Sequence, residues 1–410
     1  MNLLYCDKKG QVLEDPRYRP SFRQGRQFCS LSKKDLIKLP YGSILFSMPE
    51  RYPVTGKFAP LKNENLWAAS AFLSSGYLRT YLPGYLAAPH APILPLWAYC
   101  GVAMIDGEFY VPAIRIDKDE RSDPAIHEND PQLHREIKKH LRLYPHNRLV
   151  GQLAFCATQY RCLCARNFFL GRYEAPIPTS RPCNARCLGC LSKQKVGSRF
   201  ESSQDRLPFH PTPEEISEVI LHHFSRVKKA VSSFGQGCEG EPLMRGKDLA
   251  KAIALVRQQT DQGTINLNTN GSRPEMLKLM IDQGLNSVRI SFNSFTKKYF
   301  NGYFRPQGYE QKDVLKSVAM ALDKGLFVSL NLFFLPGFTD SQEETDSLCR
   351  FLEKYPVSMI QTRNLNIDPD FYLEQIDFKD STPMGVANLL NRLKKDFSPI
   401  KLGYYNPSIN

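Results

Sequence analysis

Three cysteines lie close together in the stretch RPCNARCLGCLSKQ, residues 181–194. Cys183, Cys187 and Cys190 follow a C-x3-C-x2-C spacing, which allows three thiolates on one short loop to point inward and hold three corners of a [4Fe-4S] cube. The fourth iron is then left without a protein ligand. An open position of this kind is useful only where another molecule must bind, as in catalytic metal sites.

Zinc and free thiols stay open as alternatives to a cluster. Structural zinc normally takes four protein ligands, and no further Cys or His lies shortly downstream of the loop. The three thiols could also carry no metal at all. If a cluster does bind, a non-catalytic iron–sulfur protein for electron transfer or sensing remains the alternative to an enzyme, and it requires a fully ligated cluster.

The chain after the cysteines alternates between apolar, β-branched strands and amphipathic helices. Thr212 is the expected cap of the first helix, which is followed by βα units. The expected strands are 231–237, 264–271, 287–293, 327–337 and 357–367, and the expected helices are 212–230, 246–259, 274–284, 311–325 and 341–355. This order predicts an α/β fold with a parallel sheet, and the number of units favours a complete or partial TIM-like (β/α) barrel. Ligands bind at the carboxyl ends of such strands.

Residues 1–175 lack this rhythm and predict a mostly β accessory or recognition domain. A hairpin is expected across Asp106-Gly107, together with one helical segment at 131–143. The predicted domains are therefore 1–175, the barrel at 176–372, and a C-terminal extension at 373–410. The apolar stretch 85–105 contains prolines at 89, 92 and 95, which argue against a membrane-spanning helix.

Composition narrows the class of partner. The chain has 410 residues and a formal net charge of +13, with the larger excess of Lys and Arg in the first 182 residues. This charge favours an anionic partner, although no RNA-binding motif accompanies it and a basic solvated surface explains it equally well. The N-terminus does not read as a secretory signal, so a cytoplasmic location is expected. Eleven cysteines with three in one loop indicate metal or redox chemistry more than disulfides.

The cysteine spacing followed by βα units resembles the radical S-adenosylmethionine (radical SAM) superfamily over residues 178–370. The resemblance implies a [4Fe-4S] cluster whose free iron is chelated by the methionine group of SAM. It also implies one-electron cleavage of the sulfonium, a 5′-deoxyadenosyl radical that abstracts a substrate hydrogen, and an electron donor such as a flavodoxin or ferredoxin. One position departs from the pattern: the family usually has an aromatic residue before the third cysteine, where this chain has Gly189.

Motifs at the expected strand ends resemble the SAM contacts of the family. Gly240, Glu241 and Pro242 resemble its GGE motif, which meets the SAM amino group, and the alternative is a glycine-rich turn. The remaining expected contacts are Asn268 and Thr269 in LNTNGS, Ser291 and Asn293 in RISFNS, and Leu335, Pro336 and Gly337 in FFLPGFTD. Local turns or helix caps explain LNTNGS and FFLPGFTD equally well.

Several residues outside these motifs carry weaker expectations. Arg363 and Asn364 lie at the end of the last strand, where a guanidinium could bind a carboxylate, unless Arg363 forms a surface ion pair. Cys156, Cys162, Cys164 and Cys238 are candidates for an auxiliary cluster, against buried free thiols. The segment 297–309 mixes aromatic and basic residues and is expected to be either a loop that closes over substrate or simple packing.

The substrate is open at this point. A peptide, protein side chain or small metabolite is expected, with RNA modification as the alternative. His222 and His223 are expected on a helix face and not as ligands.

Overall fold

The computed structural model describes residues 1–63, 65–194 and 201–409. Its centre is a parallel sheet of seven strands in the order β15-β16-β17-β18-β19-β20-β21. The strands are β15 Glu174–Ile177, β16 Val231–Phe234, β17 Thr264–Thr269, β18 Ser287–Phe292, β19 Phe327–Phe334, β20 Met359–Asn364 and β21 Lys401–Gly403. This sheet confirms the prediction of an α/β partial barrel.

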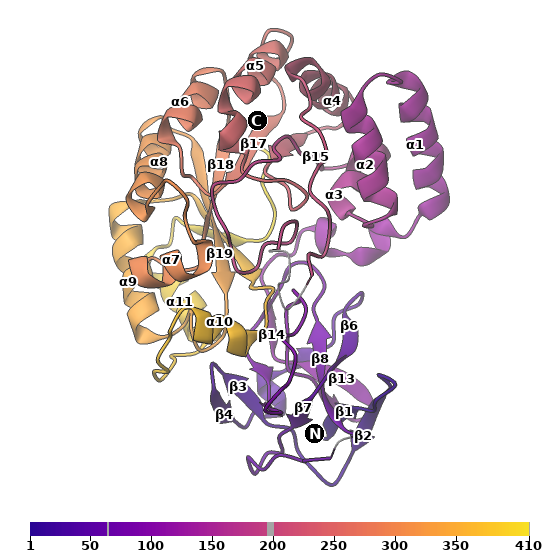
Figure 1. Cartoon of the computed structure of the whole chain (residues 1–410), viewed down its shortest axis with the longest axis vertical. Coiled ribbons are helices and arrows are strands. Elements are labelled where there is room, and N and C mark those ends of the chain that lie inside the picture. Colours follow the sequence, from indigo (N-terminus) through magenta and orange to yellow (C-terminus); the bar gives the residue numbers. More distant parts are fainter. Residues whose placement is uncertain (64, 195–200, 410) are drawn as a thin grey trace.

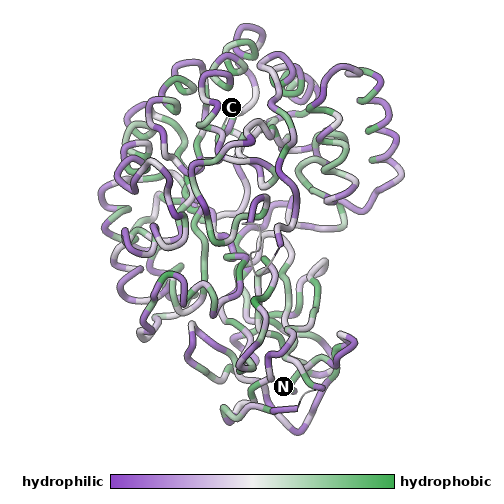
Figure 2. Tube along the Cα trace, in the orientation of Figure 1, coloured by the Kyte–Doolittle hydropathy of each residue, from purple (hydrophilic) through white to green (hydrophobic). Residues whose placement is uncertain are grey.

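Helices follow the outer side of the curved sheet and connect its strands (Figure 1). They are α4 Pro213–Arg226, α5 Gly246–Arg257, α6 Pro274–Asp282, α7 Lys297–Phe304, α8 Gln311–Asp323, α9 Gln342–Lys354, α10 Pro369–Gln375 and α11 Val386–Asp396, with the 3-10 helix η4 at Pro242–Arg245. Thr212 caps α4 in a capping box with Glu215, as the sequence predicts. Apolar residues concentrate on the strands, and the helices alternate between polar and apolar positions (Figure 2).

Residues 1–115 form small antiparallel sheets, which confirms a β-rich N-terminal region. The strands are β1 Leu3–Cys6, β2 Val12–Asp15, β3 Phe22–Gln24, β4 Gln27–Cys29, β5 Ile37–Lys38, β6 Ile44–Met48, β7 Arg51–Pro53, β8 Trp67–Phe72, β9 Tyr77–Arg79, β10 Leu82–Pro83, β11 Tyr85–Ala87, β12 Ala103–Ile105, β13 Glu108–Val111 and β14 Ala113–Arg115. The hairpin β12–β13 turns at Asp106 and Gly107, both with positive φ, as expected. Within the described ranges, no helix is long and apolar enough to cross a bilayer.

The segment between the two sheet systems contains more helix than the sequence predicts. One helix is expected there, and the structure has three, which are α1 Asp130–Leu143, α2 Arg148–Thr158 and α3 Leu163–Leu170. The short 3-10 helices of the first half of the chain are η1 Lys33–Asp35, η2 Glu120–Ser122 and η3 Pro124–His127. Buried residues of α1, α2 and α3, such as Leu133, Leu149 and Phe168, share one apolar core with the sheet. These helices therefore pack with the barrel, and a domain boundary near residue 175 stays a prediction.

The C-terminal residues bridge strands of the barrel. Strand β21 pairs with β20, so the segment 373–410 contributes to the sheet in addition to α11. Beyond β21, Asn406 donates to Glu174 on β15 at 2.7 Å and accepts from Gln361 on β20 at 2.8 Å. The Ile409 amide donates to Thr264 on β17 at 2.9 Å. The tail therefore links β15 and β17 to β20 across the open side of the sheet.

The N-terminal region docks on the loops after β19 and β20 through buried polar contacts. The Gly25 amide donates to the Pro336 carbonyl at 2.8 Å. Arg51 and Asp368 form an ion pair at 2.8 Å in which both side chains are almost fully buried. Removing one partner of such a pair leaves an uncompensated buried charge, which costs about 3–5 kcal/mol. Separating the N-terminal region from these loops therefore carries a substantial cost in free energy.

Gly337 is predicted to be essential for this docking. It has a φ of +89°, and a Cβ there would lie 1.9 Å from the Gly25 nitrogen. Gly308 has a φ of +76° with open space around it, so Gly308→Ala isolates the backbone cost of about 1–2 kcal/mol. We expect Gly337→Ala to lower the midpoint of chemical denaturation clearly more than Gly308→Ala does. Equal losses would contradict the docked arrangement.

Candidate functional site

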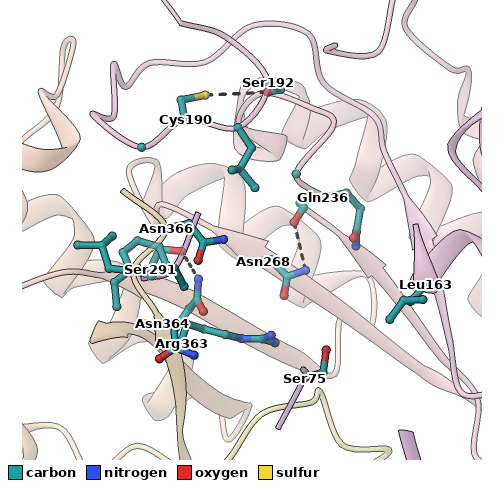
Figure 3. A pocket seen from close by; sticks show the side chains of 18 of the residues that line it. Ser75, Leu163, Cys190, Ser192, Gln236, Asn268, Ser291, Arg363, Asn364 and Asn366 are labelled. Carbon is teal, nitrogen blue, oxygen red and sulfur yellow. Dashed lines mark hydrogen bonds between the residues drawn. The ribbon is translucent and has the colours of Figure 1, made fainter. Parts of the chain in front are cut away.

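A cavity of about 810 Å³ lies at the carboxyl ends of the barrel strands. Its lining joins the cysteine loop, the ends of β16 to β20, and N-terminal residues from Phe72 to Ser75. Figure 3 shows Cys190 on one side of this space and Asn268, Ser291, Arg363 and Asn364 across from it. The structure thus brings together segments that are far apart in the sequence.

The cysteine loop is held by backbone hydrogen bonds to two neighbouring loops. Amides of Gly240 and Glu241 donate to the Ser180 and Pro182 carbonyls at 2.6 and 2.9 Å. On the opposite side, the Arg186 and Leu188 amides donate to the Phe304 and Tyr303 carbonyls at the end of α7, both at 3.0 Å. A Cβ at residue 240 would lie 2.1 Å from the Pro182 carbonyl, so only glycine permits this approach.

Cys183, Cys187 and Cys190 all line the cavity. Burial raises the pKa of Cys183 to about 11, and burial followed by the neighbouring cysteines raises the pKa of Cys187. Thiols of this kind lose their protons readily only when a metal replaces them. Within the described ranges, no three His, Cys, Asp or Glu side chains could hold a single metal ion. A cubane does not require such a group, because each cysteine binds a different iron.

Arg206 is a neighbour of the cysteines that the sequence does not reveal. Its Nη2 donates to the Cys190 sulfur at 3.6 Å, and its Nη1 donates to the Arg181 carbonyl at 2.9 Å. A guanidinium in this position stabilises negative charge on the sulfur. Together with the convergence of the three cysteines, this donor makes the loop suited to an iron–sulfur cluster.

Glu241 joins two of the predicted SAM motifs. Its carboxylate accepts from the Thr269 hydroxyl, from the Asn270 amide at 2.9 Å and from the Leu243 amide at 3.0 Å. Burial raises the pKa of Glu241 to about 7 even though these hydrogen bonds act to lower it. The Tyr309 hydroxyl is buried without a hydrogen-bond partner in the described part of the chain, and its pKa is raised by burial and also by Cys187 and Glu241 nearby.

The predicted SAM contacts fall into two groups. Those that line the cavity are Gly240, Glu241, Pro242, Asn268, Thr269 and Ser291. Those outside its lining are Asn293, Leu335, Pro336 and Gly337. Asn293 donates to the Tyr299 carbonyl and to the Tyr372 hydroxyl, both at 3.0 Å, and the Pro336 carbonyl is engaged by Gly25. A SAM contact at these four residues stays a prediction that the cavity does not support.

The packing decides three further expectations. The segment 297–309 is largely helix α7, with Tyr299, Phe300, Tyr303 and Phe304 buried, so it supports the cysteine loop and does not form a lid. Arg363 forms no surface ion pair within the described residues; it lines the cavity. Asn364 also lines the cavity and bonds to the Arg79 amide and the Tyr77 carbonyl.

Cys156, Cys162 and Cys238 lie near one another, since Cys156 and Cys162 both raise the pKa of Cys238, and an auxiliary cluster stays a prediction. The Cys238 thiol hydrogen-bonds to Cys156 and lowers the pKa of Cys156 to about 7. The Cys164 sulfur instead lies 3.7 Å from the Glu174 carbonyl oxygen. His222 lies on α4 and hydrogen-bonds to His140 and Tyr144, which confirms its place on a helix face.

Comparison with known proteins adds one finding to this geometry. Residues 177–349 match the model of the radical SAM superfamily. Residues 177–349 are a radical SAM domain. Enzymes of this superfamily use a [4Fe-4S] cluster and SAM, so these are the cofactors of this radical SAM domain.

Relatives and solved structures match only in part. The chain is 30% identical to GTP 3′,8-cyclase of Campylobacter lari over 167 residues, which are 40% of this chain and 48% of that protein. It is 27% identical to GTP 3′,8-cyclase of Petrotoga mobilis over 211 residues, 51% and 55% of the two chains. The chain thus spans about half the length of these relatives. Streptococcus suis SuiB bound to S-adenosylmethionine has a TM-score of 0.41 at 12% identity, covering 66% of this chain and 61% of that chain.

Gly189 is explained by a side chain from a different element. A Cβ at Gly189 would lie 3.1 Å from the Tyr303 hydroxyl on α7. Tyr303 lines the cavity, and burial followed by Cys187 raises its pKa. An aromatic ring is therefore present beside the third cysteine although the loop itself lacks one.

We predict that Gly189→Ala reconstitutes with a normal content of iron and sulfide, whereas Gly189→Phe loses most of it, because the larger ring displaces Tyr303. The double variant Gly189→Phe/Tyr303→Ala should recover cluster content, since the space is freed. The measurement is iron and sulfide per chain after anaerobic reconstitution. Normal content in Gly189→Phe alone would show that Tyr303 does not fill this space.

Arg206→Gln is expected to make the cluster harder to reduce, because a charged donor to the Cys190 sulfur is lost. The midpoint potential should fall by on the order of 60 mV, which corresponds to a tenfold change for one electron. Potentiometric titration followed by electron paramagnetic resonance measures it. Arg135→Gln, on the exposed face of α1, is the control, and an unchanged potential in Arg206→Gln would remove Arg206 from this role.

Proposed function

We propose that Cys183, Cys187 and Cys190 bind three irons of a [4Fe-4S] cluster, and that the chain uses SAM to remove a hydrogen atom from a small polar molecule. The proposal rests on one observation: the cysteines, Glu241 and Ser291 all line the same cavity. A volume of about 810 Å³ lies in the range of about 300–1,000 Å³ that is usual for small-molecule sites.

The chemistry available when both cofactors are bound is reductive cleavage of the SAM sulfonium and hydrogen abstraction by the resulting 5′-deoxyadenosyl radical, with electrons from a donor such as a flavodoxin or ferredoxin. The Glu241 carboxylate is placed to orient an ammonium group. Such a cation would favour the ionised carboxylate and return the pKa of Glu241 toward its ordinary value. Thr269 and Asn270 fix the carboxylate by donating hydrogen bonds to it.

The N-terminal region adds one wall to the cavity. Residues Phe72 to Ser75 form part of the lining, so a substrate bound there would contact both the barrel and this region. The relatives named GTP 3′,8-cyclase act on GTP by their name. GTP is therefore one molecule to test, beside short peptides and RNA.

The test is anaerobic reconstitution with iron and sulfide, followed by addition of SAM and dithionite. We expect the electron paramagnetic resonance signal of the reduced cluster to change when SAM is added. We also expect 5′-deoxyadenosine and methionine to accumulate, as measured by mass spectrometry. Cys187→Ala should lose both effects, whereas Cys29→Ala, in the β-rich region, should keep them.

Three outcomes would contradict the proposal in different ways. A spectrum that does not respond to SAM favours a non-catalytic iron–sulfur protein. A sample that carries zinc in place of iron and sulfide removes the cluster altogether. Copurifying RNA whose binding weakens steeply with salt would replace the small molecule by RNA as substrate.

A further inference from the structure

Two arginines on the barrel strands line the cavity without a carboxylate partner in the described part of the chain. Arg289 lies on β18 and Arg363 on β20, and both side chains reach Gln361, which also lies on β20. Arg289 Nη1 donates to Gln361 Oε1 at 2.7 Å, and Arg363 Nη2 donates to the same oxygen at 3.2 Å. Two cations thus share one neutral acceptor. In Figure 3, Arg363 lies across the cavity from Cys190.

One donor of this arginine pair has no acceptor in the described part of the chain. Arg289 Nε is buried and has no partner among the residues that the structure describes. Burial and the nearby Arg363 lower the pKa of Arg289 to about 9, as expected for a cation that lacks a counter-ion. Within residues 1–63, 65–194 and 201–409, neither arginine forms an ion pair. The carboxylate that acts to raise the pKa of Arg289 is that of Glu174, and its Oε1 accepts a hydrogen bond from Asn406.

Arg363 is held in a fixed orientation. Its guanidinium carbon lies 3.6 Å from the centre of the Tyr404 ring, and its Nη2 also donates to the Tyr404 carbonyl. Tyr404 belongs to the C-terminal tail that bridges the barrel strands. A guanidinium that is already stacked and hydrogen-bonded loses little entropy when it binds an anion, and its planar fork suits carboxylate and phosphate groups.

The two arginines lie at different depths relative to the proposed SAM contact Ser291. Arg363 pairs with Phe333 and lies nearer the strand ends than Ser291, which pairs with Asn331, whereas Arg289 lies deeper. Ser291 and Arg289 point to the same face of β18, but Arg289 precedes Ser291 by two residues, which is about 6–7 Å farther from the strand end where the cysteine loop lies. Asn331 on β19 lies beside Ser291, to which it donates at 3.1 Å, and its Oδ1 is buried without a partner among the described residues. A further polar group is thus available next to the pair.

We propose that Arg289 and Arg363 bind an anionic group, a carboxylate or a phosphate, of the molecule on which the enzyme acts. This inference rests on the proposed function, since it assigns the group to the substrate and not to SAM. Asn331 Oδ1 then accepts a hydrogen bond from a hydroxyl or amine of the same molecule. The substrate is a small anion with a neighbouring donor group, and its hydrogen to be abstracted faces the cysteine loop.

The first experiment measures anion binding to the reconstituted holoenzyme with saturating SAM. Inorganic phosphate and acetate are titrated at constant ionic strength, and binding is followed by calorimetry and by the thermal midpoint. We expect saturable binding of at least one of them to the wild-type chain and to the control Arg135→Gln. Arg289→Gln and Arg363→Gln should bind it about tenfold or more weakly, because each loses a charged hydrogen bond. Undiminished binding in both variants would overturn the proposal.

Gln361→Glu tests the same idea without removing an arginine. A carboxylate at this position supplies an internal counter-ion to both guanidiniums. We expect the thermal midpoint to rise and the stabilisation by added phosphate or acetate to disappear. A lower midpoint with undiminished anion binding would overturn the proposal even if both arginine variants failed to fold.

Both SAM and the proposed substrate can supply a carboxylate, and a measurement of SAM binding distinguishes between them. We expect the SAM-induced change in the spectrum of the reduced cluster to remain in Arg289→Gln and Arg363→Gln. A loss of SAM affinity in both variants would assign the pair to the SAM carboxylate and overturn the proposal. Anion binding by the unreconstituted chain can be measured without a cluster. Failure of SAM cleavage with intact anion binding would therefore count against the proposed function alone.

Discussion

The backbone hydrogen bonds that clamp the cysteine loop between the β16 loop and the end of α7 are the constraint on which the site depends. The loop has no regular secondary structure, so the orientation of its three thiols comes from bonds that involve the carbonyls of Ser180, Pro182, Tyr303 and Phe304. The hydrogen bonds on one side of the loop require glycine at residue 240, and those on the other side are made by the aromatic helix α7. The three thiols are thereby held at the barrel mouth.

The remaining parts of the fold enclose the space below this loop. The β-rich region docks on the loops after β19 and β20, and the tail bridges β15, β16 and β20 through Asn406. The same framework holds two guanidiniums against one amide oxygen. Like charges at about 5 Å repel by on the order of 3 kcal/mol at an effective dielectric constant of about 20. The fold has to offset this repulsion, and an anion bound between the two cations would relieve it.

Much of the barrel is predictable because βα units carry local signals. Five of its seven strands, the cap at Thr212 and the hairpin at Asp106-Gly107 follow from periodicity and turn chemistry. Strand β15 precedes the cysteine loop and β21 follows α11, so neither stands in the regular alternation of strands and helices that reveals the other five. Helices α2 and α3 are less amphipathic than α1 and give a weaker signal. Arg206, Arg289 and Tyr303 give no signal, since their roles arise only when distant segments meet. Glu241 and the three cysteines are predictable because their motifs are contiguous.

The pairing of Gly189 with Tyr303 shows that an aromatic ring can reach the third cysteine from a different element of the fold. A pattern that requires an aromatic letter before the third cysteine would pass over this protein, although a ring lies beside that residue. Searches that combine a short cysteine spacing with the volume left next to it would recover such chains. Function would then be inferred from the shape of the cavity wall instead of from a string of adjacent residues.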